Sequence, residues 1–188
     1  MPPLVSSALV LGLGGVVLWG MVSGWRHRTA RTTGLVPVLP DIPAAGARER
    51  GVARTAALEA AYVSTTTAGD WLDRVTAHDL GLPGPAVVQV FDSGVLVERQ
   101  GATDLFLPAD ALRAAGTTTG MAGKFVGGAS IVVLTWEAPG GVAGPGTWLD
   151  SGVRTRLAAD RGPLVDATTA LIETHGRGER PARQEEDL

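Results

Sequence analysis

The stretch "PAVVQVFDSGVLVER", residues 85–99, decides the fold class predicted for this chain. Two β-branched, alternating runs flank the triplet Asp92-Ser93-Gly94, and such runs are typical of strands. Asp favours the start of a turn and Gly its end, which suits a three-residue hairpin loop. The pentapeptide "FDSGV" recurs as "LDSGV" at 149–153, again between strand-like runs. The two copies predict two hairpins in an antiparallel β domain.

Further segments complete this picture. The runs "AYVSTTT" at 61–67 and "GGASIVVLTWEA" at 127–138 are β-branched or apolar, which favours a small antiparallel sheet or barrel. "RGPLVDATTALIETHG" at 161–176 reads as a helix, with Pro163 suited to its first position and Gly176 to its stop. Its apolar face comprises Leu164, Val165, Thr168, Leu171 and Ile172. We therefore expect a mainly β fold with a capping C-terminal helix.

The repeated triplet also suggests an aspartic-type hydrolase that uses Asp92 and Asp150. Such an enzyme needs two carboxylates at about 3 Å that share a proton, each in a loop braced by a substantial lobe. Only 57 residues lie between the two aspartates, too few for two full lobes. The turn interpretation is favoured, and the hydrolase is kept as an alternative.

Charge and composition exclude several classes of function. The net charge is −3, and residues 57–175 carry thirteen Asp and Glu against seven Lys and Arg. An acidic domain lacks the basic surface that a phosphate backbone requires, so nucleic acid is not an expected partner. The chain has no cysteine, and its three histidines, at 27, 78 and 175, are far apart. We expect no disulfide, metal site or cofactor, and we interpret His78 as an exposed loop residue.

The run "LVSSALVLGLGGVVLWGMVSGW" at 4–25 has no charged side chain. As a helix it would extend ~33 Å, enough to cross a hydrocarbon core of ~30 Å. Basic residues follow the run and none precedes it, which predicts an uncleaved single-pass anchor in the cell membrane with a cytoplasmic C-terminal domain. The predicted anchor residues are Leu4, Trp19, Trp25, Arg26, Arg28 and Arg31. Small residues four apart in the run offer a weak route to self-association.

The chain accordingly divides into four parts: an anchor at 1–25, a basic Pro-containing juxtamembrane linker at 26–56, the β domain at 57–176 and a disordered tail at 177–188. Within the domain, we expect the glycine-rich run at 116–128 and the turn at 139–146 to be mobile and to shape a groove.

Four segments, "YVSTTTAGDWLDRVTAHDLG", "GVLVERQGATDLFLP", "AGKFVGGASIVVLTWEA" and "LDSGVRT", resemble a family of actinobacterial membrane proteins with one N-terminal span and a bacterial PH-like domain, often labelled "transporter" or "export or membrane protein". The resemblance implies a PH-like barrel of about seven antiparallel strands in two orthogonal sheets with a C-terminal capping helix. It supplies no catalytic residues. Lipid-binding relatives hold phosphoinositides with Lys or Arg in the first hairpin loop, and the corresponding "STTTAGDWLD" at 64–73 has neither. A protein partner is therefore expected rather than a phosphoinositide.

These observations predict a non-catalytic, membrane-anchored adaptor or scaffold that binds a protein or peptide at the cytoplasmic face. The candidate binding residues are Arg154, Arg156, Trp136 and Trp148. The alternatives are an accessory subunit of a membrane transporter and the aspartic-type hydrolase.

Overall fold

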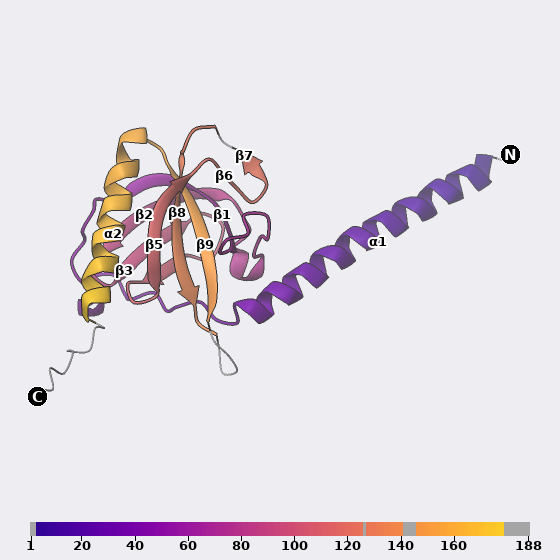
Figure 1. Cartoon of the computed structure of the whole chain (residues 1–188). Coiled ribbons are helices and arrows are strands. Elements are labelled where there is room, and N and C mark those ends of the chain that lie inside the picture. Colours follow the sequence, from indigo (N-terminus) through magenta and orange to yellow (C-terminus); the bar gives the residue numbers. More distant parts are fainter. Residues whose placement is uncertain (1–2, 126, 141–145, 179–188) are drawn as a thin grey trace, which may run out of the picture.

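The computed structural model describes residues 3–125, 127–140 and 146–178. Two α-helices, α1 (Pro3–Leu35) and α2 (Arg161–Gly178), flank a β domain in the described part of the chain (Figure 1). The strands are β1 (Leu58–Thr67), β2 (Gly84–Phe91), β3 (Gly94–Arg99), β4 (Leu105–Pro108), β5 (Leu112–Thr118), β6 (Gly120–Met121), β7 (Lys124–Phe125), β8 (Ile131–Ala138) and β9 (Thr147–Thr155). Short 3-10 helices lie at Arg48–Arg50, Ala77–Asp79 and Ala158–Asp160.

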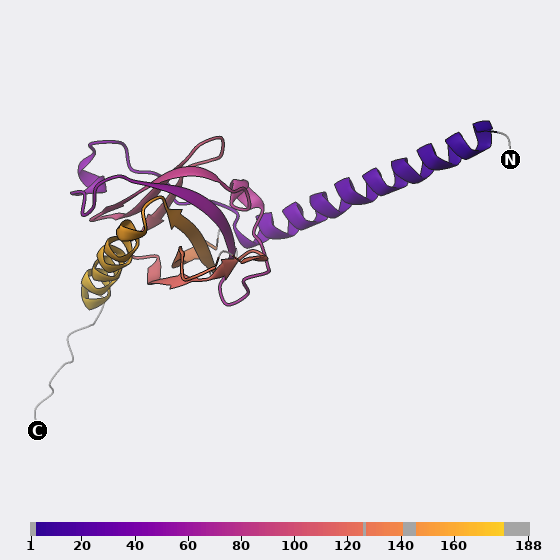
Figure 2. The ribbon, with the colours of Figure 1, turned by 90° about the horizontal axis from the view of Figure 1, so that it is seen from above.

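Seven strands form one antiparallel sheet in the order β4-β3-β2-β1-β9-β8-β5, and β6 pairs only with β7. Strand β1 joins the two halves, because residues 58–62 pair with β2 and residues 60–67 pair with β9. A register shift between Tyr62 and Ser64 interrupts the second pairing, and the sheet curls around the core (Figure 2). Seven antiparallel strands and a C-terminal helix are thus confirmed. The two sheets that the resemblance implied are joined into one continuous sheet, because both halves share β1.

The core lies on the concave side of this sheet and follows the period-2 alternation of the strands. In the β2–β3 hairpin, Val88, Val90, Val95 and Val97 are fully buried. The other face of this hairpin buries a second, smaller cluster of Phe91, Leu96 and Phe106.

Helix α2 packs beside β5 and covers the core, as predicted (Figure 1). Leu164, Thr168 and Leu171 are fully buried, and Val165 and Ile172 pack partly buried against the same cluster. The helix begins at Arg161, two residues before the predicted first position at Pro163. It ends at Gly178, two residues after the predicted stop at Gly176.

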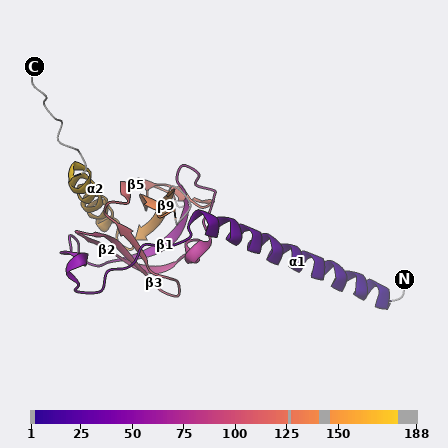
Figure 3. The same cartoon turned by 90° about the horizontal axis from the view of Figure 1, so that it is seen from below.

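Helix α1 projects away from the β domain (Figures 1 and 3) and runs ten residues past Trp25. The Oγ1 atom of Thr32 accepts a hydrogen bond of 3.2 Å from the backbone N–H of Ala77. The His78 Nε2 atom lies 2.9 Å from the Val36 carbonyl oxygen, and the Val36 side chain is fully buried. The last turn of α1 and the residue that follows it are therefore attached to the domain. His78 is partly buried at this junction, so its interpretation as an exposed loop residue was wrong.

Among the residues that the structure describes, no helix is both long and apolar enough to cross a bilayer. The span at 4–25 stays a prediction from the sequence. The Trp19 side chain is 72% exposed. The side chains of Leu4, Trp25, Arg26, Arg28 and Arg31 lie outside the described residues, as do residues 141–145 of the predicted turn and residues 179–188 of the predicted tail.

Candidate binding surfaces

The first Asp-Ser-Gly triplet is a hairpin turn, as predicted, but its loop is shorter than expected. Phe91 pairs with Gly94, which leaves only Asp92 and Ser93 between β2 and β3. A Cβ atom on Gly94 would lie 2.3 Å from the carbonyl oxygen of Leu107. This close approach of β4 explains the glycine.

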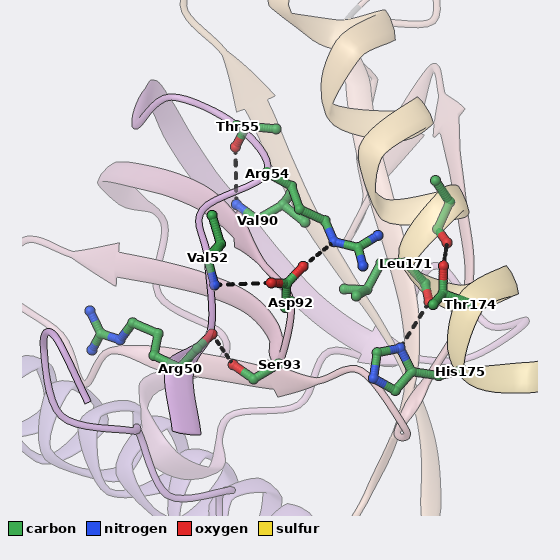
Figure 4. Close-up of polar contacts among 11 residues, drawn as sticks. Arg50, Val52, Arg54, Thr55, Val90, Asp92, Ser93, Leu171, Thr174 and His175 are labelled. Atoms are coloured by element: carbon green, nitrogen blue, oxygen red, sulfur yellow. Dashed lines mark hydrogen bonds and ion pairs between the residues drawn. The ribbon is translucent and has the colours of Figure 1, made fainter. Parts of the chain in front are cut away.

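The same turn fastens the incoming chain (Figure 4). Asp92 accepts hydrogen bonds from the backbone N–H of Val52 at 3.0 Å and from Nε of Arg54 at 2.8 Å. The hydroxyl of Ser93 donates to the carbonyl oxygen of Arg50 at 2.7 Å. The Arg54 guanidinium and the Val52 N–H hold the pKa of the Asp92 carboxyl below its ordinary value. Residues 50–54, part of the predicted linker, are thus bound along the β2–β3 hairpin.

The second triplet lies inside β9, so the prediction of a second hairpin was wrong. Asp150 pairs with Thr66 of β1 on one side and with Thr135 of β8 on the other. Because β9 has a neighbour on both sides, the backbone stays extended through the triplet. The local turn preference of Asp-Ser-Gly yields here to sheet pairing.

Each residue of the second triplet has a packing role. Ser151 is buried and faces the core, where its hydroxyl accepts a hydrogen bond from Nε1 of Trp136. Gly152 faces outward, and a Cβ atom there would lie 2.3 Å from the sulfur of Met121. Asp150 also faces outward and accepts a hydrogen bond of 2.6 Å from the hydroxyl of Thr135.

The two aspartates have separate partners. Asp150 is bound by Thr135 and, at 3.3 Å, by the backbone N–H of Gly69, whereas Asp92 is bound by Val52 and Arg54. A proton-sharing dyad needs two carboxylates in mutual contact, and the hydrogen bonds of these two aspartates go to different residues.

Within the described chain, no cluster of three or more His, Asp or Glu residues is suited to hold a metal ion.

Asp150 lines a pocket of about 280 Å³ on the outer face of the sheet. Its floor is formed by β5, β8, β9 and β1, and its walls include Trp71 and Met121. We call this the Asp150 pocket. The glycine-rich run at 116–128, expected to shape a groove, lines this pocket with residues 116–118, 120 and 121. These residues belong to the end of β5 and to the β6–β7 hairpin and not to a loop.

Arg154 and Arg156 line a second groove, of about 540 Å³, between β1, β2 and β9. The Nη1 atom of Arg156 lies 2.7 Å from the Oε2 atom of Glu59, and both side chains are well exposed. Arg154 is also exposed, and Ala61 and Pro85 contribute to the lining. We call this the Arg154 groove. The structure thus brings two of the four candidate binding residues together.

The other two candidates lie apart from this groove. Trp136 is fully buried in the core, which leaves no surface of its side chain for a partner. Trp148 is 44% exposed, and the Arg113 guanidinium lies 5.4 Å from the centroid of one of its rings.

A third surface is formed by β5 and α2. Strand β5 is the last strand of the sheet, and among the described strands it pairs with β8 alone. Its residues Arg113, Ala114 and Thr117 are exposed. A groove of about 300 Å³ lies between the start of β5 and the end of α2, lined by residues that include Leu112, Ile172 and His175. We call this surface the β5 edge.

The model of the bacterial PH domain-like family matches residues 36–169, and the chain belongs to this family. The match begins at the residue that follows α1 and covers the whole sheet and the first half of α2. In the comparison with curated proteins, no sequence matches the chain. The family therefore supports a PH-like, adaptor-type domain.

Proposed function

We propose that the protein is a non-catalytic, membrane-anchored adaptor that binds an extended segment of a partner protein at the β5 edge. The observation that carries the proposal is the position of β5, whose outer edge pairs with no other strand among the described residues and lies beside the apolar groove at α2. An open strand edge recruits extended peptides through backbone hydrogen bonds, and a neighbouring pocket selects their side chains.

Two features support the membrane anchor. The run at 4–25 has the length and composition of a membrane span. In addition, the described part of α1 exposes large apolar side chains, including Val16 at 65%, Val17 at 54% and Leu18 at 64%. An apolar surface of this kind marks contact with a lipid or a protein. With arginines after the run, the β domain faces the cytoplasm in our proposal.

Site-specific photo-crosslinking in native membranes tests the binding surface. A benzophenone amino acid is introduced one position at a time in the full chain: at Thr117 on the β5 edge, at Arg154 in the rival groove, at Val17 in α1 and at Glu98 on β3 as an exposed control. The proposal predicts a crosslinked protein from Thr117 that is absent from Glu98.

The other outcomes separate the alternatives. Crosslinks from Arg154 but not from Thr117 would move the interface to the Arg154 groove. Crosslinks from Val17 alone would favour an accessory subunit held in a membrane complex by its helix. The hydrolase alternative predicts peptide cleavage by the wild-type chain that is lost in both Asp92→Asn and Asp150→Asn.

Orientation is tested by reporters fused after Leu188. We expect activity from a reporter that works only in the cytoplasm. Activity from a reporter that works only outside the cell would overturn the orientation and the cytoplasmic adaptor.

A further inference from the structure

The Asp150 pocket exists because the outward-facing residues of β5 are small. Ala114 and Gly116 line it, and a Cβ atom added to Gly116 would meet no atom within 4 Å. On the next strand, Val133 and Thr135 pair with these positions and complete the floor. A side chain at position 116 would therefore extend into this space.

Two oxygen acceptors lie in the lining of this pocket. The Asp150 carboxylate accepts hydrogen bonds from Thr135 and Gly69, and no Lys, Arg or His forms an ion pair with it in the described chain. Its cross-strand neighbour Thr66 is only 1% exposed, and its hydroxyl has no hydrogen-bond partner among the residues that the structure describes. A buried hydroxyl without a partner is costly, so a ligand with N–H donors would relieve this cost.

The walls are apolar, polarizable and fixed in place. Trp71 and Met121 form side walls of the pocket, beside the sheet residues that form its floor. The carbonyl oxygen of Trp71 accepts a hydrogen bond of 2.7 Å from the N–H of Ala122, which ties the turn that carries Trp71 to the β6–β7 hairpin. Arg74, the basic residue of that turn, donates to the Ala122 carbonyl at 3.0 Å. Trp71 is 53% exposed, so its ring is accessible to a ligand.

We propose that the Asp150 pocket binds a cationic group, an ammonium or guanidinium, carried on a short alkyl chain. The carboxylate of Asp150 and the hydroxyl of Thr66 accept the N–H donors of this group, and such charge-assisted hydrogen bonds are among the stronger ones in proteins. The Trp71 ring attracts the cation through its face. Ala114, Val133 and Met121 contact the alkyl chain. This site shares Ala114 and Thr117 of β5 with the β5 edge, but it lies on the outer face of the sheet and has no residue in common with the groove at α2.

The proposal is tested on the full chain in detergent micelles, labelled with 5-fluorotryptophan and observed by ¹⁹F NMR. The Trp71 resonance is assigned with Trp71→Phe. The probes are N-acetyl-arginine amide and N-acetyl-citrulline amide, which have nearly the same shape and differ in charge. We expect saturable shifts of the Trp71 resonance with the arginine probe and at least about tenfold weaker binding of the citrulline probe.

Three variants test the residues of the site. Asp150→Asn keeps an oxygen for Thr135 but removes the charge, and we expect it to weaken binding of the arginine probe at least about tenfold. Gly116→Val fills the floor and abolishes binding. Asp166→Asn removes one negative charge from the exposed face of α2, outside the pocket, and leaves binding unchanged.

The source of the cation follows from two more probes. Tighter binding of 1,4-diaminobutane than of the blocked amino acids identifies a free polyamine as the ligand. Tighter binding of N-acetyl-arginine amide or N-acetyl-lysine amide identifies a basic side chain of a protein. Equal binding of the arginine and citrulline probes, or no shift of the Trp71 resonance with any probe, overturns the proposal. Because Thr117 also lines the Asp150 pocket, crosslinking is repeated from Arg113, which lines the groove at α2 and not this pocket. We expect that crosslink to be unaffected by Asp150→Asn, so the two proposals fail independently.

Discussion

The indole Nε1 of Trp136 donates a hydrogen bond of 3.0 Å to the hydroxyl of Ser151, deep in the core of the domain. The same hydroxyl oxygen lies 2.7 Å from that of Thr65, which in turn contacts the phenol of Tyr62. A chain of four polar groups thus crosses the barrel interior from β8 to β1. Burial raises the pKa of the Tyr62 phenol, and the interactions of this chain lower it to a smaller extent. The serine of the second triplet is therefore a core residue.

We expect Ser151→Ala to lower the free energy of unfolding by about 1–3 kcal/mol, because it leaves the buried Nε1 of Trp136 without a partner. Ser93→Ala, the same change in the first triplet, removes only a partly buried bond to Arg50 and should cost less. Urea unfolding of both variants measures the difference. An equal loss in the two would contradict the role of the buried chain.

The two glycines of the triplets offer a second matched comparison. Gly94→Ala places a Cβ atom 2.3 Å from the backbone oxygen of Leu107, and the backbone of a paired strand cannot move without disturbing the sheet. Gly152→Ala places a Cβ atom equally close to the sulfur of Met121, which is the flexible part of a side chain. We expect Gly94→Ala to lower the free energy of unfolding by more than about 2 kcal/mol and Gly152→Ala by less. Thermal unfolding that ranks them in the opposite order would contradict this account.

Much of the fold could be predicted from local patterns. The alternation at 85–99 predicts a hairpin because its apolar positions repeat with period 2, and Leu164, Thr168 and Leu171 predict the buried face of α2 because they follow the helical period. The same local reading failed at 150–152. There, β9 pairs with the preceding strand β8 on one side and with β1, from a distant part of the sequence, on the other. No local preference reveals the pairing with β1.

The candidate sites were harder to predict for the same reason. Arg154 and Arg156 are two residues apart at the end of β9, so their proximity followed from the sequence, whereas the groove that they line was not predicted. Thr66 and Asp150 are adjacent because β1 pairs with β9. Trp71, in the turn after β1, lines the same pocket. A partly exposed tryptophan beside a turn carries no periodic signal that would distinguish it from a core residue.

The lowered pKa of Asp92 predicts that the stability contributed by its bonds to residues 52 and 54 depends on pH in the acid range. Its pKa lies below the ordinary value of 3.8 in the folded chain, so its contribution to stability is complete above that value. The contribution is lost as the pH falls through the lower, folded-state pKa. We expect Asp92→Asn to reduce the loss of stability of the full chain over this acid range, relative to Asp166→Asn. Thermal unfolding from pH 6 to pH 2 measures it, and parallel curves for the two variants would contradict the prediction.

The last prediction concerns the contribution of the segment that follows α1 to the stability of the domain. Val36 is fully buried in the core, and Leu39 packs partly buried against the same core cluster. The His78 side chain contacts the Val36 carbonyl oxygen. A fragment of residues 32–178 keeps these contacts, whereas one of residues 47–178 loses them. Fully burying a valine contributes about 1.5–3 kcal/mol, so we expect the shorter fragment to be less stable by at least that amount.

Urea unfolding of the two fragments measures this difference, and substitutions in the longer fragment control for the change in length. Val36→Ala should reproduce part of the loss. Val38→Ala should have little effect, since that side chain is 56% exposed. Equal stability of the two fragments would mean that residues 36–46 do not contribute to the core, and it would place the start of the folded unit after Gly46.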